Sequence, residues 1–565
     1  MSQQLGPDQK PTFLDRGTII ALVLVAGVWF AWSKYVEMKY PTPPTVNQPI
    51  GADEKPGGKP GDKPLPAAVA GANTTPKGDA DAKAAVSNTP EMAAAAKHAE
   101  AKEKVETAHW SSELSSWGMG FSAIDLKEFK TRDDKPILVG ATPIGLFATK
   151  LAGAADPIIF DIKKKSDIEW VGTSNQGAYK VEKTIKFETE GAASGRAMKI
   201  TTIASGDLAK FPGFAVMISD EVSAPVSTSF LAPSYDHHDW FVRYEDTSKR
   251  NVINPAKPEP IEHKTARTAA LSSHYFTAAI SDHSDLRPDF TAPAPVKDGE
   301  IYHAVGTLEY KPSSKSNEFK TEQTAYVGSK DVDSLRAADA DFGKVVDYGM
   351  FAILADPLLW LMRFLHSIFG NWGFAIVGLT IIVRAIVLYP NYYSFRSMKV
   401  MQKIQPQIAL VKERYKSDPK RMNEEVMRLM KENKANPIGG CLPMLIQLPV
   451  FFALYQVLGQ SIELYRQPFI FWIHDLTIKD PYYVLPVLMG ISMFFQQKLT
   501  PVADPQQAKI LKFMPLIFSA LMFSLPSGLT LYIFVSTLFG ITQQYVFMKE
   551  KSDAKSQNNV REAKA

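Results

Sequence analysis

The chain has 565 residues, a formal net charge of only +4 and a mean hydropathy of −0.11. This length exceeds one compact domain, and a hydropathy close to that of a soluble protein, in a chain with long apolar runs, requires both membrane and aqueous parts. The small net charge gives no indication of a nucleic-acid partner, and the single cysteine, Cys441, excludes an intramolecular disulfide.

The N-terminal part of the chain changes composition twice. Residues 1–16 are polar, and residues 17–33 form an apolar run without a small-x-small cleavage site close behind it. This pattern favours a retained transmembrane anchor with a cytoplasmic N-terminus over a cleaved signal peptide. Residues 34–106 are rich in Pro, Gly, Ala and Lys, which predicts a flexible linker.

Residues 107–337 contain short alternating or β-branched runs separated by Gly, Pro, Asp and Ser, and this pattern predicts an all-β sandwich domain. The cluster 235–239 (YDHHD) offers metal-ligating side chains, but no third ligand stands at a helical or strand spacing. We therefore expect an exposed loop there, and no metal. The sequence 57–60 (GGKP) lacks the spacing of a nucleotide-binding loop, so we predict no cofactor.

Two apolar segments follow the β domain. Within the region 338–370, residues 351–369 are apolar but interrupted by charged residues and Pro357, which favours an amphipathic helix on the membrane surface. Residues 371–390 are long enough to cross a bilayer and hold one charge, Arg384. An arginine inside a membrane helix costs about 3 kcal/mol on insertion scales, so it normally faces protein or water and marks a site. The alternative is that Arg384 lies close enough to the helix end to snorkel.

No acidic partner for Arg384 is visible, because the other apolar runs carry Asp and Glu only at their edges. A buried arginine without such a partner needs water or polar side chains. Thr380 lies one helical turn before it, on the same face. Other polar residues inside apolar runs are Gln447, Gln496, Ser536 and Thr537. We predict a wet, positively charged cavity within the membrane, with no catalytic residue.

Residues 391–436 are strongly basic and should remain in the cytoplasm. Apolar residues repeat at spacings of three and four on both sides of residues 417–419, which predicts an antiparallel helical hairpin. Asp418 is a suitable N-cap and Pro419 a suitable first helical residue, and Pro406 should kink the first helix. The basic residues either keep the hairpin soluble or bind RNA or lipid phosphates. They include Lys399, Lys403, Lys412, Arg414, Lys416 and Arg421.

Residues 437–548 predict four more transmembrane helices, at 442–461, 482–499, 510–525 and 527–548, followed by a basic tail at 549–565. With the anchor and the Arg384 helix, this makes six spans and returns the C-terminus to the cytoplasm. Two of the spans are shorter than the ~30 Å hydrocarbon core, so they should thin the bilayer locally.

Two blocks of sequence resemble the YidC/Oxa/Alb family of membrane protein insertases. The first is NPIGGCLPMLIQLPVF at residues 436–451, and the second comprises Phe513-Met514-Pro515, PSGL at 526–529 and Leu531-Tyr532. The β domain resembles the periplasmic domain of the Gram-negative branch, by its placement and by Ser273-His274-Tyr275-Phe276.

The resemblance implies a core of five helices around a hydrophilic groove. Arg384 then matches the groove arginine, Thr380, Gln447 and Tyr532 match groove positions, and the hairpin matches the loop that receives nascent chains. It also implies an insertase and chaperone of the cell inner membrane that is not an enzyme. Its expected partners are newly made integral membrane proteins, the Sec translocon, the lipid bilayer and, through the hairpin and basic tail, the ribosome.

Three other functions are weighed against this one. A secondary transporter would use the Arg384 cavity as a solute pathway, but neither an inverted repeat nor an intramembrane carboxylate is visible. A sensor would be expected to carry a cytoplasmic output domain, and only the hairpin and a short tail are present. An enzyme in the β domain would need a constellation of catalytic residues, which the sequence does not contain.

Overall fold

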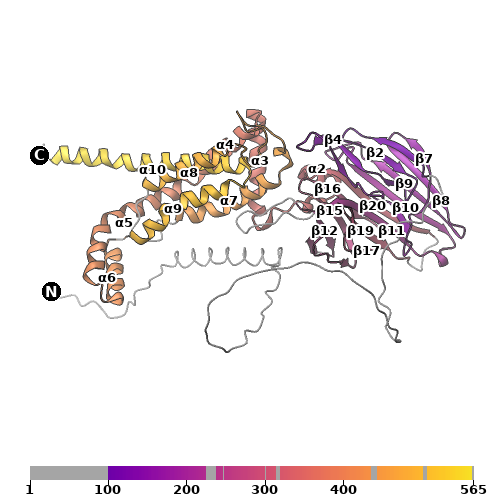
Figure 1. Ribbon diagram of the computed structural model, residues 1–565, viewed down its shortest axis with the longest axis horizontal. Helices are drawn as coiled ribbons and strands as arrows, with labels where there is room; N and C mark the ends of the chain where they lie inside the picture. Colours follow the sequence, from indigo (N-terminus) through magenta and orange to yellow (C-terminus); the bar gives the residue numbers. More distant parts are fainter. Residues whose placement is uncertain are drawn as a thin grey trace, which may run out of the picture. The chain divides into compact units, whose positions relative to one another are not determined.

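The structure is a computed structural model that describes residues 100–223, 237–245, 247–299, 301–312, 318–433, 435, 442–499 and 505–562. The predicted N-terminal tail, the anchor at 17–33 and most of the linker lie outside the described residues. The described part contains a β-rich domain followed by a helical region (Figure 1).

The β-rich domain is built from three antiparallel sheets. The largest contains, in spatial order, β13 (Thr247–Val252), β12 (Asp239–Tyr244), β15 (Ala266–Ser272), β16 (Phe276–Asp282), β20 (Glu318–Ser329), β10 (Ala197–Gly206), β9 (Tyr179–Phe187), β8 (Glu169–Asn175) and β7 (Asp161–Ser166). The second contains β14 (Ile261–His263), β17 (Asp289–Ala292), β19 (Ile301–Tyr310), β11 (Phe214–Val222) and β6 (Thr149–Leu151), with β18 (Val296–Asp298) paired to β19. The third contains β1 (Lys102–Glu106), β2 (Trp110–Ser115), β4 (Ile124–Lys130) and β5 (Pro136–Val139), with β3 (Gly120–Phe121) paired to β2.

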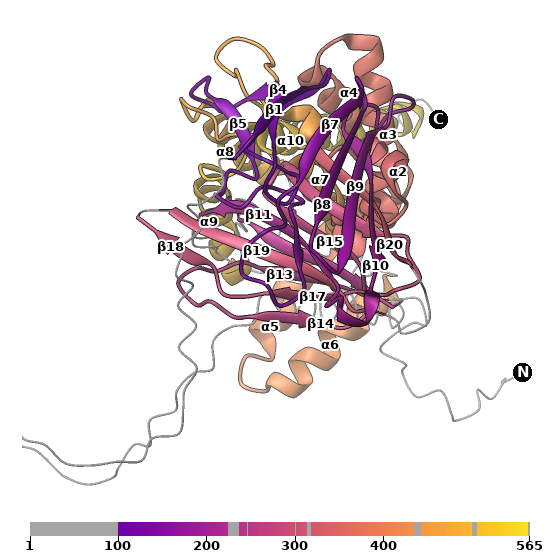
Figure 2. The same ribbon diagram turned by 90° about the vertical axis from the view of Figure 1, so that its right-hand side faces the viewer.

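Alternating side chains explain how the two larger sheets form a sandwich. In β9, Tyr179, Val181, Ile185 and Phe187 point inward, while the even-numbered residues from 180 to 186 are more exposed. Figure 2 shows strands β7–β10 and β17–β19 running in different directions. Residues from both larger sheets share one hydrophobic core, as expected for packed sheets.

The inward face of β9 also carries a charge. Lys183 is fully buried, and its Nζ donates hydrogen bonds to the carbonyl oxygens of Gly118, Met119 and Phe147 at 2.9, 2.9 and 2.7 Å. Burial lowers the pKa of Lys183 to about 7. The three carbonyl oxygens stabilise the ammonium form, because each accepts one of its hydrogen bonds.

Both predicted boundaries of the β domain need correction. The linker does not extend to residue 106, because β1 pairs with β2 from Lys102 to Glu106. The charge-rich sequence of β1 (KEKVE) gives little local strand signal, and the pairing partner decides its structure. At the other end, the last residues of the predicted β domain form the helix α2 (Val332–Ala338), which begins where Asp331 accepts a hydrogen bond from the Ser334 amide.

Among the described residues, the helical region contains eight longer helices, whose arrangement Figure 1 shows. They are α3 (Ala352–Phe369), α4 (Trp372–Ile386), α5 (Leu388–Arg414), α6 (Pro419–Glu432), α7 (Leu442–Gln460), α8 (Val484–Leu499), α9 (Pro505–Met522) and α10 (Ser527–Glu562). Short 3₁₀ turns are η1 (Leu208–Lys210) in the β domain and η2 (Phe342–Val345), η3 (Gly349–Phe351) and η5 (Ile462–Leu464) beside the helices. Helix α4 packs on α3 and α10, and α10 packs on α8, around a second hydrophobic core.

Local sequence explains the main helix ends. Gly370, with φ of 65°, ends α3 in the left-handed conformation that glycine adopts readily. Asn371 begins α4, because its Oδ1 accepts hydrogen bonds from the amides of Gly373 and Phe374. Asp418 caps α6 by accepting from the Arg421 amide, and Pro419 is its first residue.

The predicted spans differ from the observed helices in three places. The segment 371–390 is divided, since α4 ends at Ile386 and α5 begins at Leu388. Helix α9 begins and ends earlier than the predicted span 510–525. Helix α10 continues to Glu562, through most of the predicted separate tail, because no helix-breaking residue follows the apolar run.

Within the described ranges, only α3 is long and apolar enough to cross a membrane by length and composition. Its buried face contains Ala355, Leu359, Met362 and Leu365. The segments Trp372–Ile386, Leu445–Gln460, Val484–Leu499 and Phe513–Met522 are apolar but shorter. The count of six spans and the surface position of α3 therefore stay predictions.

Candidate functional site

Arg384 lies in the last turn of α4 and contacts α10. Its Nε donates a hydrogen bond to the Ser536 hydroxyl at 2.7 Å, and its Nη2 donates to the same oxygen. Ser536 is buried. The ionic contacts found within the described ranges include no carboxylate within 4 Å of the Arg384 guanidinium. The charge is therefore held by a neutral oxygen on a neighbouring helix.

A second polar pair lies one turn away on α10. The Nε2 of Gln447, on α7, donates a hydrogen bond to the Tyr532 hydroxyl at 2.5 Å. Tyr532 precedes Ser536 by four residues, so the two side chains lie on the same face of α10. The Oε1 of Gln447 is buried and has no hydrogen-bond partner among the residues that the structure describes. A buried acceptor without a partner costs about 1–3 kcal/mol, which makes this oxygen available to a water or a ligand.

Gln496 extends this polar face in the other direction. A Cβ atom added at Gly540, four residues after Ser536, would lie 2.7 Å from the Gln496 Nε2. The Gln496 amide on α8 therefore packs directly against α10 at Gly540. The positions Tyr532, Ser536 and Gly540 of α10 thus meet polar side chains from α7, α4 and α8, respectively. We call Arg384, Gln447, Gln496, Tyr532 and Ser536 the polar cluster.

The two predicted threonines are buried but do not donate hydrogen bonds to the other helices. The Thr380 hydroxyl donates to the Ile376 carbonyl at 2.7 Å, and the Thr537 hydroxyl donates to the Ile533 carbonyl at 2.8 Å. Each bond satisfies the hydroxyl within its own helix. Thr380 still lies one turn before Arg384, where its oxygen adds polarity to the same side of α4.

Two further residues were missed by the sequence reasoning. Asn391 at the start of α5 and Gln543 on α10 are buried, and within the described part of the chain the Asn391 Oδ1 and Gln543 Nε2 have no hydrogen-bond partner. The rings of Tyr392 and Phe547 pack 5.5 Å apart, which brings the start of α5 beside this part of α10. The signal in the sequence was the polar pair Gln543-Gln544 inside a predicted span.

A second arginine in an apolar helix provides a contrast. Arg363 of α3 binds Asp331 at 3.0 Å and Asp333 at 2.5 Å, and it also binds Glu463. These carboxylates come from the N-terminal end of α2 and from η5. Arg363 is thus neutralised by its partners and joins three segments, whereas no carboxylate among the described residues compensates the charge of Arg384.

The hairpin residues are distributed over α5, α6 and the turn between them. Lys403, Arg414, Lys416 and Arg421 are exposed and Lys412 is half-buried, while the side chain of Lys399 lies outside the described part. The Arg421 guanidinium lies 5.8 Å from the centre of the Tyr415 ring. The two helices meet through an apolar seam that includes Ile404, Ile408, Val426 and Leu429.

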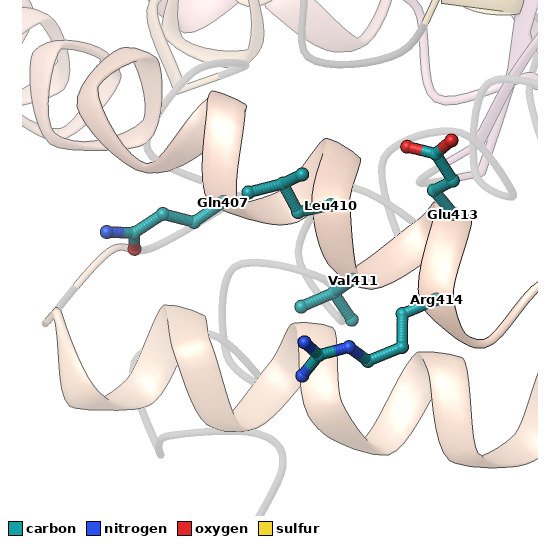
Figure 3. Close-up of a pocket in the computed structure, with 5 residues that line it drawn as sticks. All are labelled: Gln407, Leu410, Val411, Glu413 and Arg414. Atoms are coloured by element: carbon teal, nitrogen blue, oxygen red, sulfur yellow. The ribbon is translucent and has the colours of Figure 1, made fainter.

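A cavity of about 520 Å³ lies against α5, lined by Gln407, Leu410, Val411, Glu413 and Arg414. Figure 3 shows Val411 and Arg414 on one side of the helix and Glu413 on the other. This cavity does not include any member of the polar cluster.

The cluster at 235–239 is only partly visible, since residues 235 and 236 lie outside the described part. Both carboxylate oxygens of Asp239 accept hydrogen bonds from the Arg250 Nη1, each at 2.8 Å. Across the described ranges, no group of three His, Cys, Asp or Glu side chains is placed to hold a metal ion.

Comparisons with known proteins identify two matching family models. The model described as "60Kd inner membrane protein" matches residues 364–555, and "YidC periplasmic domain" matches residues 165–361. Similar curated proteins include "Membrane protein insertase YidC" of Campylobacter jejuni, which is 48% identical over 235 residues, 41% of this chain and 44% of the relative. The relative of the same name from Anaeromyxobacter dehalogenans is 42% identical over 314 residues, 54% of this chain and 56% of the relative.

The chain therefore spans about half the length of the curated relatives it matches. Among solved structures, similar chains include an "Active YidC insertase" crystal structure, with 20% identity, a TM-score of 0.36 and coverage of 80% of this chain and 93% of the other. YidC from Thermotoga maritima has 17% identity, a TM-score of 0.28 and coverage of 79% and 98%, respectively.

Proposed function

This chain belongs to the family of YidC membrane protein insertases, and from this premise we propose that it inserts newly made integral membrane proteins through the polar cluster. The observation that carries the proposal is the charge of Arg384. It lies in an apolar helix and is held by the Ser536 hydroxyl rather than by a carboxylate. A cation kept in this state attracts an acidic segment of another chain.

The proposed topology has six spans, with both termini in the cytoplasm and the β domain in the periplasm. Its basis is the apolar character of α4, α7, α8, α9 and α10 together with the basic hairpin after α4. The surrounding membrane would be the cell inner membrane, as the description of the family model that matches residues 364–555 suggests.

The proposed mechanism avoids full desolvation of the substrate. A short polar tail of the substrate enters the polar cluster, where Arg384 attracts its acidic residues and the unpaired oxygen of Gln447 accepts a hydrogen bond. Only part of the bilayer then remains to be crossed. Release of the substrate's apolar helix into lipid supplies the free energy, about 25 cal/mol for each Å² of apolar surface removed from water.

The cytoplasmic partners belong to the same proposal. The exposed basic residues of the hairpin, including Lys403, Arg414, Lys416 and Arg421, offer a surface for nascent chains or ribosomal RNA. Cooperation with a Sec translocon would extend the activity to larger substrates. No step of this proposal needs ATP or covalent chemistry.

The proposal is tested with proteoliposomes that contain this protein alone and a single-span substrate with an acidic tail. Protection of the tail from an external protease measures insertion. We expect wild type to insert without ATP, Arg384→Ala to lose most of this activity, and Arg384→Lys to retain part of it. Arg336→Ala removes an exposed arginine far from the polar cluster in sequence and serves as the matched control.

A substrate with a neutral tail separates electrostatic attraction from general damage. The effect of Arg384→Ala should be smaller for that substrate, because no charge is being attracted. Absence of protection with wild type, across several substrates, would contradict independent insertion. That result would favour a strictly translocon-dependent role or a transporter.

A further inference from the structure

The loop between α7 and α8 carries an exposed apolar tip. Its sequence from Pro468 to Ile473 is PFIFWI, with Arg466 and Asp475 on its two sides. The Phe471 side chain is 81% exposed, and Ile470 is also exposed. An aromatic ring this exposed in water forfeits the free energy that burial would provide.

Hydrogen bonds make this tip a defined structure. The Phe469 amide donates to the Ile473 carbonyl at 2.9 Å, which closes the tip on itself. The buried carboxylate of Asp480 accepts from the Trp472 Nε1 at 3.0 Å and from the amides of Tyr482 and Leu485 at 3.0 and 2.7 Å. Asp480 therefore ties the aromatic tip to the start of α8.

The backbone at Phe471 is strained. Its φ is +55°, in the left-handed region that costs a residue with a side chain about 1 kcal/mol or more. The Phe471 ring stacks on Trp472, with centroids 5.9 Å apart and an interplanar angle of 19°. The fold thus maintains an unfavourable conformation that presents two adjacent aromatic rings at the tip.

The tip joins a second exposed apolar segment, the turn between α3 and α4. The rings of Phe469 and Phe374 lie 5.2 Å apart, and the Asn371 Nδ2 donates to the Pro468 carbonyl at 3.1 Å. A Cβ at Gly373 would lie 2.0 Å from the Phe469 ring, so only glycine permits this contact. Exposed apolar side chains of this turn are Ile368, Phe369 and Phe374. We call these residues together with Ile470, Phe471 and Trp472 the aromatic tip surface.

We propose that the aromatic tip surface inserts into the boundary between lipid headgroups and acyl chains, at the end of α4 opposite the hairpin. Aromatic residues concentrate at this boundary because their rings are apolar and their polar atoms remain solvated or hydrogen-bonded. The flanking charges of Arg466 and Asp475 are engaged by Asp134 and Arg132 of the β domain, so neither is an unpaired charge beside the apolar tip.

The proposal deepens the proposed function and rests on it, because it assumes that α4 lies in a bilayer. Arg384 follows Trp372 by 12 residues, which places it about 18 Å along the helix from the anchored end. The aromatic tip surface would therefore set the depth at which the Arg384 charge meets a substrate tail.

A spin-label experiment measures this depth in proteoliposomes of phosphatidylcholine. The single cysteine permits a Cys441→Ser background, into which Phe471→Cys is introduced and labelled with a nitroxide. Ile491→Cys, on the exposed apolar face of α8, is the reference within the bilayer, and Val296→Cys, on β18, is the aqueous reference. The ratio of the nitroxide's collision rate with oxygen to its collision rate with a water-soluble nickel chelate reports its depth in the bilayer.

We expect the oxygen-to-nickel ratio at position 471 to exceed that at position 296 several-fold and to stay below that at position 491. A ratio equal to that at position 296 would overturn the proposal. Low collision rates with both reagents would also overturn it, because protein would then cover the site. If the collision rates then rise when the protein is diluted with additional lipid, the covering protein is a second copy of this chain.

Two substitutions at Phe471 test whether the aromatic tip surface inserts into the lipid boundary, because one removes the aromatic ring and the other keeps it. Asn tolerates the left-handed conformation and is polar, whereas Trp keeps an aromatic ring. A label at Ile368→Cys should become more accessible to nickel, about twofold or more, with Phe471→Asn and should not change with Phe471→Trp. Unchanged accessibility of this label to nickel with Phe471→Asn would contradict the insertion of the aromatic tip surface. The depth readout does not depend on insertion activity, so its failure is distinguishable from a failure of the proposed function.

Discussion

At the scale of single residues, the contrast between Arg384 and Arg363 shows how surroundings decide the role of a charge. Arg363 is bound by three carboxylates, whereas Arg384 is bound by one serine hydroxyl. A cation already paired with carboxylates has little attraction left for another anion, while an uncompensated cation in a region of low dielectric constant retains it. The absence of a carboxylate beside Arg384 is therefore central to the proposed function.

Supplying the missing carboxylate should inactivate the site. In Ser536→Asp, the new carboxylate would lie at the position that Arg384 already contacts and would neutralise it. We expect insertion of acidic-tailed substrates to fall at least tenfold and insertion of neutral-tailed substrates to fall less, measured by protease protection. The exchange Arg384→Ser with Ser536→Arg keeps one guanidinium and one hydroxyl, and it should recover part of the activity. Full activity of Ser536→Asp would contradict the role of the charge.

His274 gives the contact between the β domain and α7 a predictable dependence on pH. The ring Nε2 lies 2.7 Å from the carbonyl of Gly459 in the last turn of α7, so the ring donates a hydrogen bond to a carbonyl at the end of the helix. Burial lowers the pKa of His274 to about 3, and nearby Lys330 acts in the same direction. The unfolded chain binds a proton near pH 6.5 and the folded chain does not.

This difference gives the sign of the effect. The contribution of neutral His274 to stability is complete above about pH 6.5 and decreases as the pH falls toward 3, by at most about 1.4 kcal/mol per pH unit. His274→Gln retains a donor for Gly459 but does not titrate. Lowering the pH from about 6.5 to about 4.5 should therefore destabilise wild type more than the variant, and thermal unfolding at each pH measures this loss of stability. Equal losses of stability would refute the prediction.

At the scale of elements, the short connections determine how the helices meet. Helix α3 is joined to α2 and η5 by Arg363, and Gly370 and Asn371 turn the chain directly into α4. Helix α10 contacts α4, α7 and α8, so its one polar face collects side chains from three other helices. The position of α10 thus determines whether the polar cluster exists.

The Arg363 contacts should stabilise this arrangement. Arg363→Ala leaves three carboxylates close together without a cation, at a side chain that is only partly exposed. We expect a loss of about 2 kcal/mol, between the values for exposed and buried ion pairs. Faster proteolysis between α2 and α3 would measure the loss. Arg336→Ala, which breaks the more exposed 3.3 Å pair between Arg336 and Asp356 of α3, should have little effect. Equal proteolysis of both variants would disprove a special role of Arg363.

At the scale of the whole molecule, the proposed topology requires the lengths of the helices to match the membrane. Helices α4 and α8 have 15 and 16 residues, so each spans about 22–24 Å, compared with a hydrocarbon core of ~30 Å. In the proposed topology, a bilayer around such short helices must thin, and thinning reduces the distance that a substrate tail crosses.

Bilayer thickness should therefore control activity. In proteoliposomes of phosphatidylcholines with increasing acyl-chain length, we expect the rate of insertion to fall as the bilayer thickens, because the cost of thinning grows with each ångström of mismatch. Rates are measured by protease protection and corrected for spontaneous insertion into protein-free vesicles. A corrected rate independent of chain length would show that thinning does not contribute.

The sequence by itself determined the local features of this protein. Alternating runs predicted the strands, apolar runs predicted the helices, and Asp418 and Pro419 predicted the start of α6, because periodicity and capping depend on neighbouring residues. The sequence also isolated Arg384 as a charge without an acidic neighbour. Boundaries were less accurate where a strand such as β1 depends on its partner.

Only the tertiary structure decided which distant residues meet. It paired Arg384 with Ser536 across 152 residues and His274 with Gly459 across 185 residues, and it gathered three carboxylates around Arg363. It also turned the Thr380 and Thr537 hydroxyls back onto their own helices. These outcomes depend on the rotation of each helix about its axis, which is fixed by packing against several neighbours at once and not by the local pattern of the sequence.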